Sequence, residues 1–368
     1  MKIRAAYVPE RNRLTVAEVE LDPPKERELL VRIHAAGVCH SDLHTLKGEL
    51  RTQPPLVLGH EGAGVVEAVG PGVTRFAVGD RVLINWLPAC HICTQCQSGR
   101  PNLCERLAST TYQGALIDGT SRLHTEEGVS VKQYLSASTM ADYAVIPEDG
   151  AVMLQEDVSF DVGAIIGCAV ITGVGAVINT AKVRPGSSAA VIGCGGIGLS
   201  AVLGCVVAGC HTIIAVDVFD EKLAFAKQLG ATHTVNARQE DPVQALKSIT
   251  GGGPDYAFDS VGSARTIPQA LNATGPAGVT TVMGLHAALE DVPISAGQLI
   301  FQNKSLLGCF AGSARPDIDL PNLQRLYLAG KLDLDKLISK RYPLDDIALA
   351  FEDMEAGKVA RGVLVFDS

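Results

Sequence analysis

Four cysteines lie close together in the segment CHICTQCQSGRPNLC, as Cys90, Cys93, Cys96 and Cys104. Four thiolates complete a tetrahedral zinc site and leave no open position for substrate, so such a site is structural. An iron–sulfur cluster, a disulfide pair and chance are the alternatives, but nothing else in the sequence suggests electron transfer. The spacing therefore predicts a structural zinc ion.

Three further potential metal ligands are far apart in the sequence. Cys39 lies in AAGVCHSDLH, His60 in GHEGAGVVEAVG and Cys168 in IGCAVITG. Two thiolates and one imidazole would form an open zinc site that takes water or substrate at its fourth position. The spacing alone does not establish that these three residues converge. The other cysteines lie in apolar surroundings and are expected to be small core residues: Cys194, Cys205, Cys210 and Cys309.

A glycine-rich loop, AAVIGCGGIGLSA, contains Gly193, Cys194, Gly195, Gly196, Ile197 and Gly198. An apolar strand precedes it, a helix follows it, and Asp217 ends the next strand, which is the context of a dinucleotide-binding fingerprint. The first helical N–H groups would bind the pyrophosphate. Asp217 would bind the adenosine ribose and repel a 2′-phosphate, and the next three residues include no cation. The loop predicts NAD rather than NADP, and a glycine turn without a ligand is the alternative.

The elements that must position these residues differ between the two halves of the chain. Short β-like runs separated by Pro and Gly, at 29–33, 64–69, 81–84 and 143–146, predict a mostly β domain. After residue 161 a long uncharged helix is expected at 162–180. Strands and helices then alternate, which predicts a parallel sheet covered by helices. Two helices (320–329 and 345–354) and a strand (363–366) are expected in the tail.

Composition excludes several classes of protein. The chain has 368 residues, enough for two domains, with 47% hydrophobic and 19% charged residues. Its net charge of −9 without a basic cluster argues against a nucleic-acid or anionic-membrane partner. The N-terminus lacks a signal-peptide pattern, so a cytoplasmic protein is expected. Residues 187–216 carry no Asp, Glu, Lys or Arg, but their glycines favour a strand, a turn, a buried helix and a second strand over a membrane helix.

The order and spacing of these motifs resemble one family. GHEGAGVVEAVG, the Cys-His-Ser-Asp element, the four-cysteine segment and the glycine loop occur together in zinc-dependent alcohol dehydrogenases of the medium-chain dehydrogenase/reductase superfamily. The resemblance extends from about residue 2 to residue 366. It implies an α/β fold with a GroES-like, mostly β catalytic domain (1–169 and 311–368). A Rossmann NAD-binding domain with a doubly wound parallel sheet (170–310) would be inserted into it.

The resemblance also implies roles for individual residues. Cys39, His60 and Cys168 match the ligands of a catalytic zinc ion, and Glu61 matches an acid beside it. Asp42 would orient His60, and Ser41 and His44 would form the proton relay. Besides the glycine loop and Asp217, the positions that match cofactor contacts are His40, Thr172, Ile197, Lys222, Leu285 and Arg361. His286 could also reach the cofactor.

The implied reaction is reversible hydride transfer between a primary alkyl or aryl alcohol and NAD. Apolar and aromatic residues match the substrate pocket: Leu50, Trp86, Tyr134, Leu135, Leu285 and Phe310. One alternative is the branch that oxidises thiol adducts of formaldehyde, whose pocket uses an acid and an arginine. Here Leu50 stands where the acid would be. No arginine matches the family's arginine position, although Arg106 and Arg122 lie near it in the sequence. A zinc-stabilised dinucleotide-binding protein without turnover is the other alternative.

Resemblance further predicts a homodimer, because a long insert at about 107–138 is typical of the dimeric branch. A mobile surface loop is the alternative interpretation of the insert. The expected seam is a sheet edge near 299–310.

Overall fold

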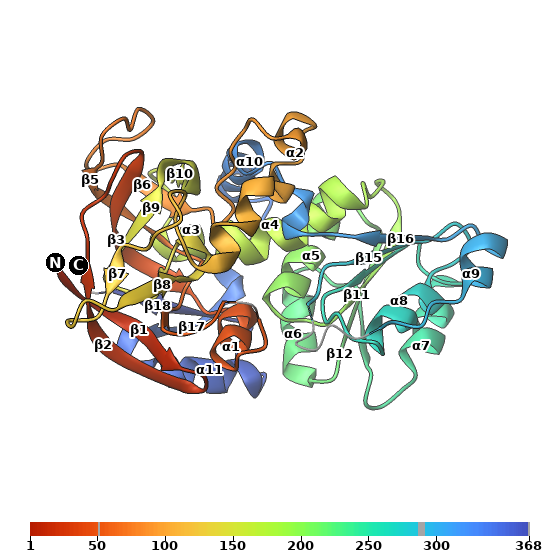
Figure 1. Cartoon of the computed structure of the whole chain (residues 1–368). Helices are drawn as coiled ribbons and strands as arrows, with labels where there is room; N and C mark the ends of the chain where they lie inside the picture. Colours follow the sequence, from red (N-terminus) through yellow and green to blue (C-terminus); the bar gives the residue numbers. More distant parts are fainter. Residues whose placement is uncertain (51, 286–290, 367–368) are drawn as a thin grey trace.

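The computed structural model describes residues 1–50, 52–285 and 291–366. The chain forms a β-rich lobe and a lobe built on a parallel sheet, and both chain termini lie on the β-rich side (Figure 1). The last strands of the chain return to the β-rich lobe after the parallel sheet is complete. His286, one of the expected cofactor contacts, lies outside the described residues.

The β-rich lobe consists of a closed barrel and a larger sheet, and the N-terminal strands of the chain are divided between them. The barrel strands, in spatial order, are β1 (Lys2–Glu10), β2 (Arg13–Leu21), β7 (Leu123–His124), β8 (Ser130–Gln133) and β4 (Leu56–Val57). The sheet follows the order β10 (Ala151–Met153), β6 (Arg81–Ile84), β5 (Ala63–Val69), β3 (Glu28–Gly37), β18 (Arg361–Val365) and β17 (Ile338–Pro343), with β9 (Tyr143–Pro147) paired to β3.

The second lobe contains a six-stranded sheet in which all neighbouring strands are parallel. Every residue of β11 is buried, as expected for a strand covered on both faces. The order places β11 between β12 and β14, so the chain changes direction across the sheet there, as it does where Rossmann folds bind ligands. The strands in order are β13 (His233–Asn236), β12 (Thr212–Asp217), β11 (Ser188–Ile192), β14 (Tyr256–Asp259), β15 (Val279–Val282) and β16 (Ser305–Gly308).

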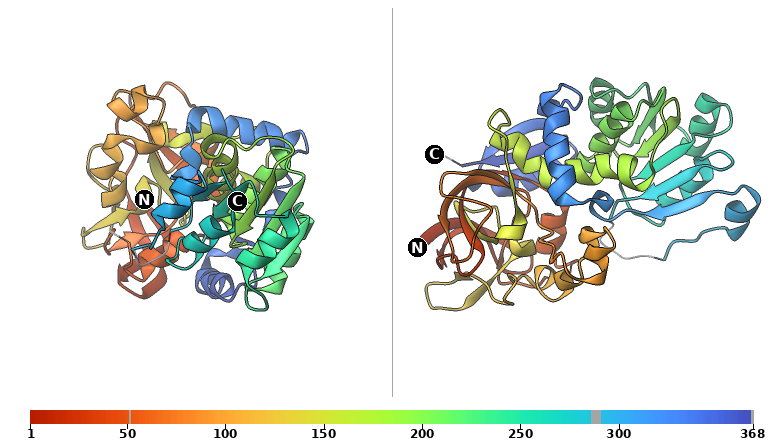
Figure 2. Two further views of the ribbon diagram at one scale, coloured as in Figure 1. Left: turned by 90° about the vertical axis from the view of Figure 1, so that its right-hand side faces the viewer. Right: turned by 90° about the horizontal axis from the view of Figure 1, so that it is seen from above.

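Helices cover both faces of this sheet, as Figure 2 shows from the side. Local signals explain where several of them begin: Asp241 accepts a hydrogen bond from Gln244 N, and Pro242 occupies the first position of its helix. The α-helices are α1 (His40–Leu46), α2 (Thr94–Gln97), α3 (Phe160–Ile165), α4 (Ile171–Gly175), α5 (Gly196–Val207), α6 (Asp220–Gln228), α7 (Pro242–Thr250), α8 (Thr266–Ala273), α9 (Ala296–Phe301), α10 (Pro316–Leu328) and α11 (Ile347–Glu355). Short 3₁₀ turns are η1 (Pro101–Leu103), η2 (Glu105–Ala108), η3 (Thr111–Gln113), η4 (Tyr134–Ser136), η5 (Glu148–Gly150), η8 (Ala311–Ser313), η9 (Asp335–Leu337) and η10 (Leu344–Asp346).

A continuous helical segment from Phe160 to Thr180 joins the two lobes. It is long and apolar enough to cross a membrane, with a mean hydropathy of 2.0, but 89% of its most apolar window is buried inside the molecule. Its residues pack in one core with strands of both sheets. The segment is therefore a core helix, and two of its turns are π-helical: η6 (Ile166–Val170) and η7 (Ala176–Thr180).

The insert at 107–138 is packed against the barrel, which contradicts its interpretation as a mobile surface loop. Arg122 is fully buried, and its guanidinium group donates hydrogen bonds to Glu28 and Asp118. Leu116 and Val131 are also fully buried in the barrel core. The physical reason is that the insert supplies two barrel strands, β7 and β8, whose backbone groups pair with β2 and β4.

The expected seam, 299–310, divides between two elements. Residues 299–301 lie in helix α9, and only Ser305–Gly308 forms an edge strand, so the first part of the predicted edge is wrong. Gly308 is the last residue of that strand, and Phe310 follows it directly.

Candidate metal and dinucleotide site

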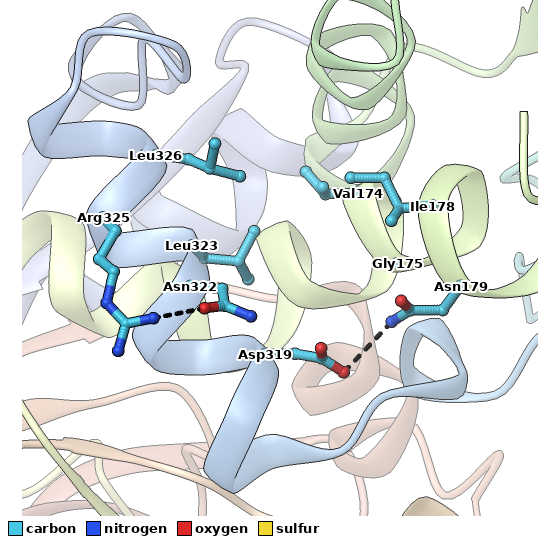
Figure 3. A pocket seen from close by; sticks show the side chains of 9 residues that line it. All are labelled: Val174, Gly175, Ile178, Asn179, Asp319, Asn322, Leu323, Arg325 and Leu326. Atoms are coloured by element: carbon cyan, nitrogen blue, oxygen red, sulfur yellow. Dashed lines mark hydrogen bonds between the residues drawn. The ribbon is translucent and has the colours of Figure 1, made fainter. Parts of the chain in front are cut away.

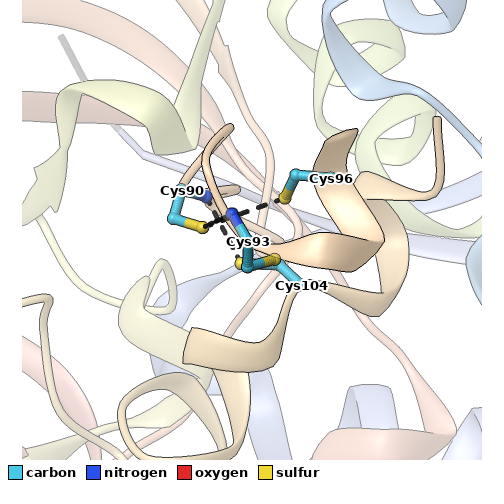
Figure 4. A group of neighbouring side chains, drawn as sticks. All are labelled: Cys90, Cys93, Cys96 and Cys104. Carbon is cyan, nitrogen blue, oxygen red and sulfur yellow. Dashed lines mark hydrogen bonds between the residues drawn. The ribbon is translucent and has the colours of Figure 1, made fainter. Parts of the chain in front are cut away.

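The cysteines at 90, 93, 96 and 104 converge in one lobe beside α2 (Figure 4). Their sulfur atoms all lie within 4.8 Å of one another. Backbone N–H groups already point at these sulfurs: Cys93 N lies 3.3 Å from Cys90 Sγ, and Cys90 N lies 3.3 Å from Cys104 Sγ. Backbone hydrogen bonds from Cys96 and Glu105 lower the pKa of Cys93 to about 6. This donor set fits a closed zinc site.

A second group of potential ligands is buried. Cys39, His60, Glu61 and Cys168 each place one donor atom within 4.8 Å of the others. They come from three separate parts of the chain. Cys39 directly precedes α1, and His60 and Glu61 lie between β4 and β5. Cys168 lies in the π-helical turn η6. A hydrogen bond from Cys168 and the adjacent His60 imidazole lower the pKa of the Cys39 thiol well below its usual value. Thiolate, imidazole and carboxylate together fit zinc.

Asp42 lies beside the His60 ring. Its Oδ2 lies 3.1 Å from His60 Nδ1, and its Oδ1 accepts a hydrogen bond from Gly59 N at 2.8 Å. Both side chains are buried. With Nδ1 facing the carboxylate, the other ring nitrogen is left for a metal ion, as in many metal sites. Burial disfavours the charged imidazole, but Asp42 and Cys39 outweigh that effect and raise the pKa of His60.

Glu61 forms a buried ion pair with Arg361 at the start of β18. Its other carboxylate oxygen, Oε2, has no partner among the described residues. A Cβ atom at Gly37 would lie 1.9 Å from that oxygen, so a side chain there would displace the Glu61 carboxylate. Glu61 is thus held beside the ligand cluster with one oxygen uncommitted.

Aromatic rings form one wall of the ligand cluster. Trp86 and Tyr134 both meet the His60 ring edge to face, at centroid distances of 5.9 and 5.6 Å. Phe310 meets Trp86 in the same way at 5.7 Å. Leu135 belongs to the same buried apolar cluster, whereas Leu50 is only half-buried and Leu285 is 51% exposed. The described structure therefore brings four of the six predicted pocket residues together.

The two expected relay residues lie on α1 beside the cluster. Ser41 Oγ lies 3.7 Å from Cys39 Sγ, and the Ser41 carbonyl accepts a hydrogen bond from the Tyr134 hydroxyl at 3.1 Å. One turn further, His44 Nδ1 lies 2.5 Å from a carboxylate oxygen of Glu49. His40 is exposed, and its ring centre lies 6.3 Å from that of His44. The helix thus leads from the buried ligands toward solvent.

The glycine loop has the shape of a phosphate cradle. A Cβ atom at Gly198 would lie 1.8 Å from the Gly193 carbonyl, whereas a Cβ atom at Gly195 would meet nothing within 4 Å. Gly198 thus leaves no room for a side chain, whereas Gly195 faces open space at the N-terminus of α5. An exposed backbone at a helix N-terminus fits a pyrophosphate.

Several predicted cofactor contacts surround this loop. Asp217 Oδ2 accepts a hydrogen bond from Cys194 N at 2.7 Å, and Lys222 follows in the first turns of α6. Thr172 is buried on α4, next to Gly173, where a Cβ atom would lie 2.3 Å from the Ile197 carbonyl. A Cβ atom at Gly196 would lie 2.9 Å from the Arg361 guanidinium. Arg361 therefore contacts both the glycine loop and Glu61.

Asn102 makes a contact at the site that sequence reasoning missed. Its side-chain amide donates a hydrogen bond to the Phe310 carbonyl at 3.0 Å. This bond links the four-cysteine segment to the aromatic wall. A single asparagine in a loop carries no pattern that could have identified it.

A separate cavity of about 340 Å³ lies between α4, η7 and α10 (Figure 3). Asn179 donates a hydrogen bond to Asp319 across it, and Arg325 donates one to Asn322. The cavity contains none of the predicted site residues.

Comparisons with known proteins agree with this geometry. The family model described as "Alcohol dehydrogenase GroES-like domain" matches residues 25–156, and that described as "Zinc-binding dehydrogenase" matches 196–327. The chain is 39% identical to an S-(hydroxymethyl)glutathione dehydrogenase of Paracoccus denitrificans, with 100% of both chains covered. It is also 39% identical to an alcohol dehydrogenase class-3 of Cereibacter sphaeroides, with the same coverage.

Solved structures give the same result. The benzyl alcohol dehydrogenase of Acinetobacter calcoaceticus superimposes with a TM-score of 0.94 at 36% identity, covering 100% of both chains. A family match over both lobes and full-length relatives above 30% identity decide the assignment. The chain belongs to the zinc-dependent alcohol dehydrogenases of the medium-chain dehydrogenase/reductase superfamily, and it is an oxidoreductase with a GroES-like and a Rossmann-type domain.

Proposed function

We propose that the protein oxidises primary alcohols with an alkyl or aryl body to aldehydes, reversibly, with NAD. The observation that carries the proposal is the buried ligand cluster at Cys39, His60 and Cys168, which has an aromatic wall on one side and Arg361 leading to the glycine loop on another. When bound, zinc supplies Lewis acidity that lowers the pKa of an alcohol, and NAD supplies the hydride acceptor.

The chain's own residues orient the substrate and carry its proton away. The Trp86 and Tyr134 rings exclude water from one side of the cluster and favour an apolar substrate body. Ser41 Oγ, beside Cys39, accepts the hydroxyl proton. His44, 21% exposed and oriented by Glu49, passes the proton to solvent. Asp217 binds the ribose hydroxyls, which favours NAD.

Zinc is proposed at two positions in each chain. Cys39, His60 and Cys168 would hold the catalytic ion, with Glu61 as an additional carboxylate nearby. Cys90, Cys93, Cys96 and Cys104 would hold the structural ion. The domain boundaries at 169/170 and 310/311 stay predictions.

Oxidation of S-(hydroxymethyl) thiol adducts is the second candidate, because two relatives, at 39% and 38% identity, are named S-(hydroxymethyl)glutathione dehydrogenase. The residues at or near the corresponding sequence positions argue against it. Leu50 offers no charge, and Arg122 is fully buried in ion pairs with Glu28 and Asp118. Arg106 Nη2 lies 3.8 Å from Asp149. Arg122 is therefore committed within the barrel, whereas Arg106 Nη2 has no hydrogen-bond partner among the described residues, so only Leu50 and Arg122 argue against an acidic thiol.

A substrate screen tests the proposal. NAD reduction would be measured with hexanol, benzyl alcohol and the formaldehyde adduct of glutathione. We expect kcat/KM for benzyl alcohol or hexanol to exceed that for the adduct at least about tenfold. A difference of this size is expected when the adduct lacks one well-placed polar contact in the pocket. The Cys168→Ser variant should be inactive, whereas Cys210→Ser, a half-buried cysteine outside both ligand sets, should keep its activity. A preference for the adduct would establish the second candidate instead, and no turnover with any of the three would favour a binding protein.

We also propose a homodimer in the cytoplasm that binds neither nucleic acid nor membrane. β16 is the end strand of the six-stranded sheet, so one of its edges can pair with a second copy. Ile300 and Phe301 on the adjacent α9 are 71% and 89% exposed, which adds apolar surface beside this edge. All ten cysteines are free thiols, as is usual in a reducing compartment.

A further inference from the structure

Two cationic side chains lie on the ring of Phe219, two residues after Asp217, the proposed ribose-binding carboxylate. The Lys222 ammonium lies 5.2 Å from the centre of the Phe219 ring, and the Arg238 guanidinium carbon lies 4.8 Å from the same centre. Phe219 itself donates a backbone hydrogen bond to Asp217 Oδ1 at 3.1 Å. One aromatic ring, two residues after the carboxylate in the chain, therefore gathers two positive charges.

The strand register brings Arg238 to this place. Asp217 at the end of β12 pairs with Asn236 at the end of β13, and Ala237 N donates a hydrogen bond to the Asp217 carbonyl at 3.0 Å. Arg238 is the next residue, so its backbone lies beside the ribose-binding strand end although it is 21 residues further along the chain. The local sequence after Asp217, which contains no cation in its next three residues, could not reveal it.

Neither cation is neutralised by a described acidic residue. No ion pair of Lys222 or Arg238 occurs within residues 1–50, 52–285 and 291–366. The nearby Asp220 accepts a hydrogen bond from the Asn236 amide at 2.7 Å. Arg238 is exposed, so its contact with Phe219 is a weak cation–π interaction that an anion can replace.

We propose that Arg238 and Lys222 form a latent site for the 2′-phosphate of NADP, which Asp217 keeps closed. This inference rests on the proposed dinucleotide site. Asp217 repels a 2′-phosphate, whereas an arginine beside the ribose binds one through charge-assisted hydrogen bonds. Arg238 is therefore a specificity-determining residue for the cofactor, and the site opens when the charge at position 217 is removed.

The test uses two nucleotides that carry no redox chemistry. The affinities of 5′-AMP and 2′,5′-ADP differ only through the 2′-phosphate, and isothermal titration calorimetry on the intact, zinc-loaded protein measures both. In the Asp217→Gly variant we expect 2′,5′-ADP to bind at least about tenfold more tightly than 5′-AMP, the value of one charged hydrogen bond. The Asp217→Gly/Arg238→Gln double variant should lose this advantage.

A matched control separates the site from general charge. Lys227 is exposed in the last turn of α6, and Asp217→Gly/Lys227→Gln should keep the full advantage of 2′,5′-ADP. The proposal is overturned if Asp217→Gly binds 5′-AMP but shows no gain for 2′,5′-ADP, or if the gain survives Arg238→Gln. Failure of the folded wild-type protein to bind 5′-AMP would refute the dinucleotide site and the latent site together. Failure of the latent site alone is therefore distinguishable from failure of the dinucleotide site.

Discussion

Replacing Arg122 by Met should destabilise the β-rich lobe strongly. Arg122 is fully buried, and the Glu28 side chain, only 6% exposed, accepts its Nε–H at 2.8 Å. Met has a similar length without charge, so the substitution leaves the Glu28 carboxylate buried and uncompensated. Removal of one partner from a buried ion pair costs about 3–5 kcal/mol. We expect the free energy of unfolding to fall by about that amount.

Trp86 provides the assay because it is the only tryptophan in the chain and lies buried in the β-rich lobe. Urea unfolding followed by its fluorescence reports on this lobe directly. The unfolding measurement should be made at pH 7. Burial raises the pKa of Asp118, but hydrogen bonds from Thr120 and Arg122 outweigh that effect and lower it to about 2. The stabilisation from Asp118 is therefore complete above about pH 4 and is lost as the pH falls toward 2.

Two further variants decide whether the buried charge is the cause. Glu28→Gln/Arg122→Met should recover about 2 kcal/mol relative to Arg122→Met, since no uncompensated charge remains. Arg13→Met removes an exposed ion pair with Glu10, 3.2 Å long, and should cost less than about 1 kcal/mol. The reasoning is refuted if Arg122→Met costs no more than Arg13→Met, or if the double variant is no more stable than Arg122→Met.

Three shorter predictions concern the cofactor, the relay and the assembly. The unmutated protein should have a much higher kcat/KM with NAD than with NADP, and Asp217→Gly should narrow that ratio; equal values in the unmutated protein would disprove the role of Asp217. His44→Gln should slow turnover most at low pH, where solvent base is scarce, and an unchanged pH–rate profile would mean that protons leave by another route. Size exclusion with light scattering should give a homodimer mass, and a clean tetramer would show that the insert does not determine assembly.

Local patterns in the sequence predicted the elements of the parallel sheet well. The predicted alternation of strands and helices after residue 161 is confirmed by β11, β12, β14 and β15, because strands covered on both faces read as continuous apolar runs. The N-terminal strands β1 and β2 were not predicted, since their half-exposed residues mix polar and apolar side chains. The four-cysteine cluster could be predicted because its ligands lie within one short segment.

Convergence over long distances was beyond sequence reasoning. No spacing shows that Cys39, His60 and Cys168 meet, and only the resemblance to a family joined them. The π-helical turn η6, which carries Cys168, has no signal in an apolar run, although such turns often occur at functional sites. Arg238 reaches Asp217 through strand pairing, which depends on the register of β12 and β13 rather than on local sequence.

Metal analysis combined with activity tests the central claim, that two zinc ions with separate roles support the reaction. Elemental analysis of the folded, active protein should give two zinc ions per chain. Cys168→Ser should retain one zinc ion and the fold but lose activity, whereas Cys93→Ser should lose stability first, because a closed metal site contributes to folding. One zinc ion per folded, active chain, or an active Cys168→Ser variant, would contradict the account.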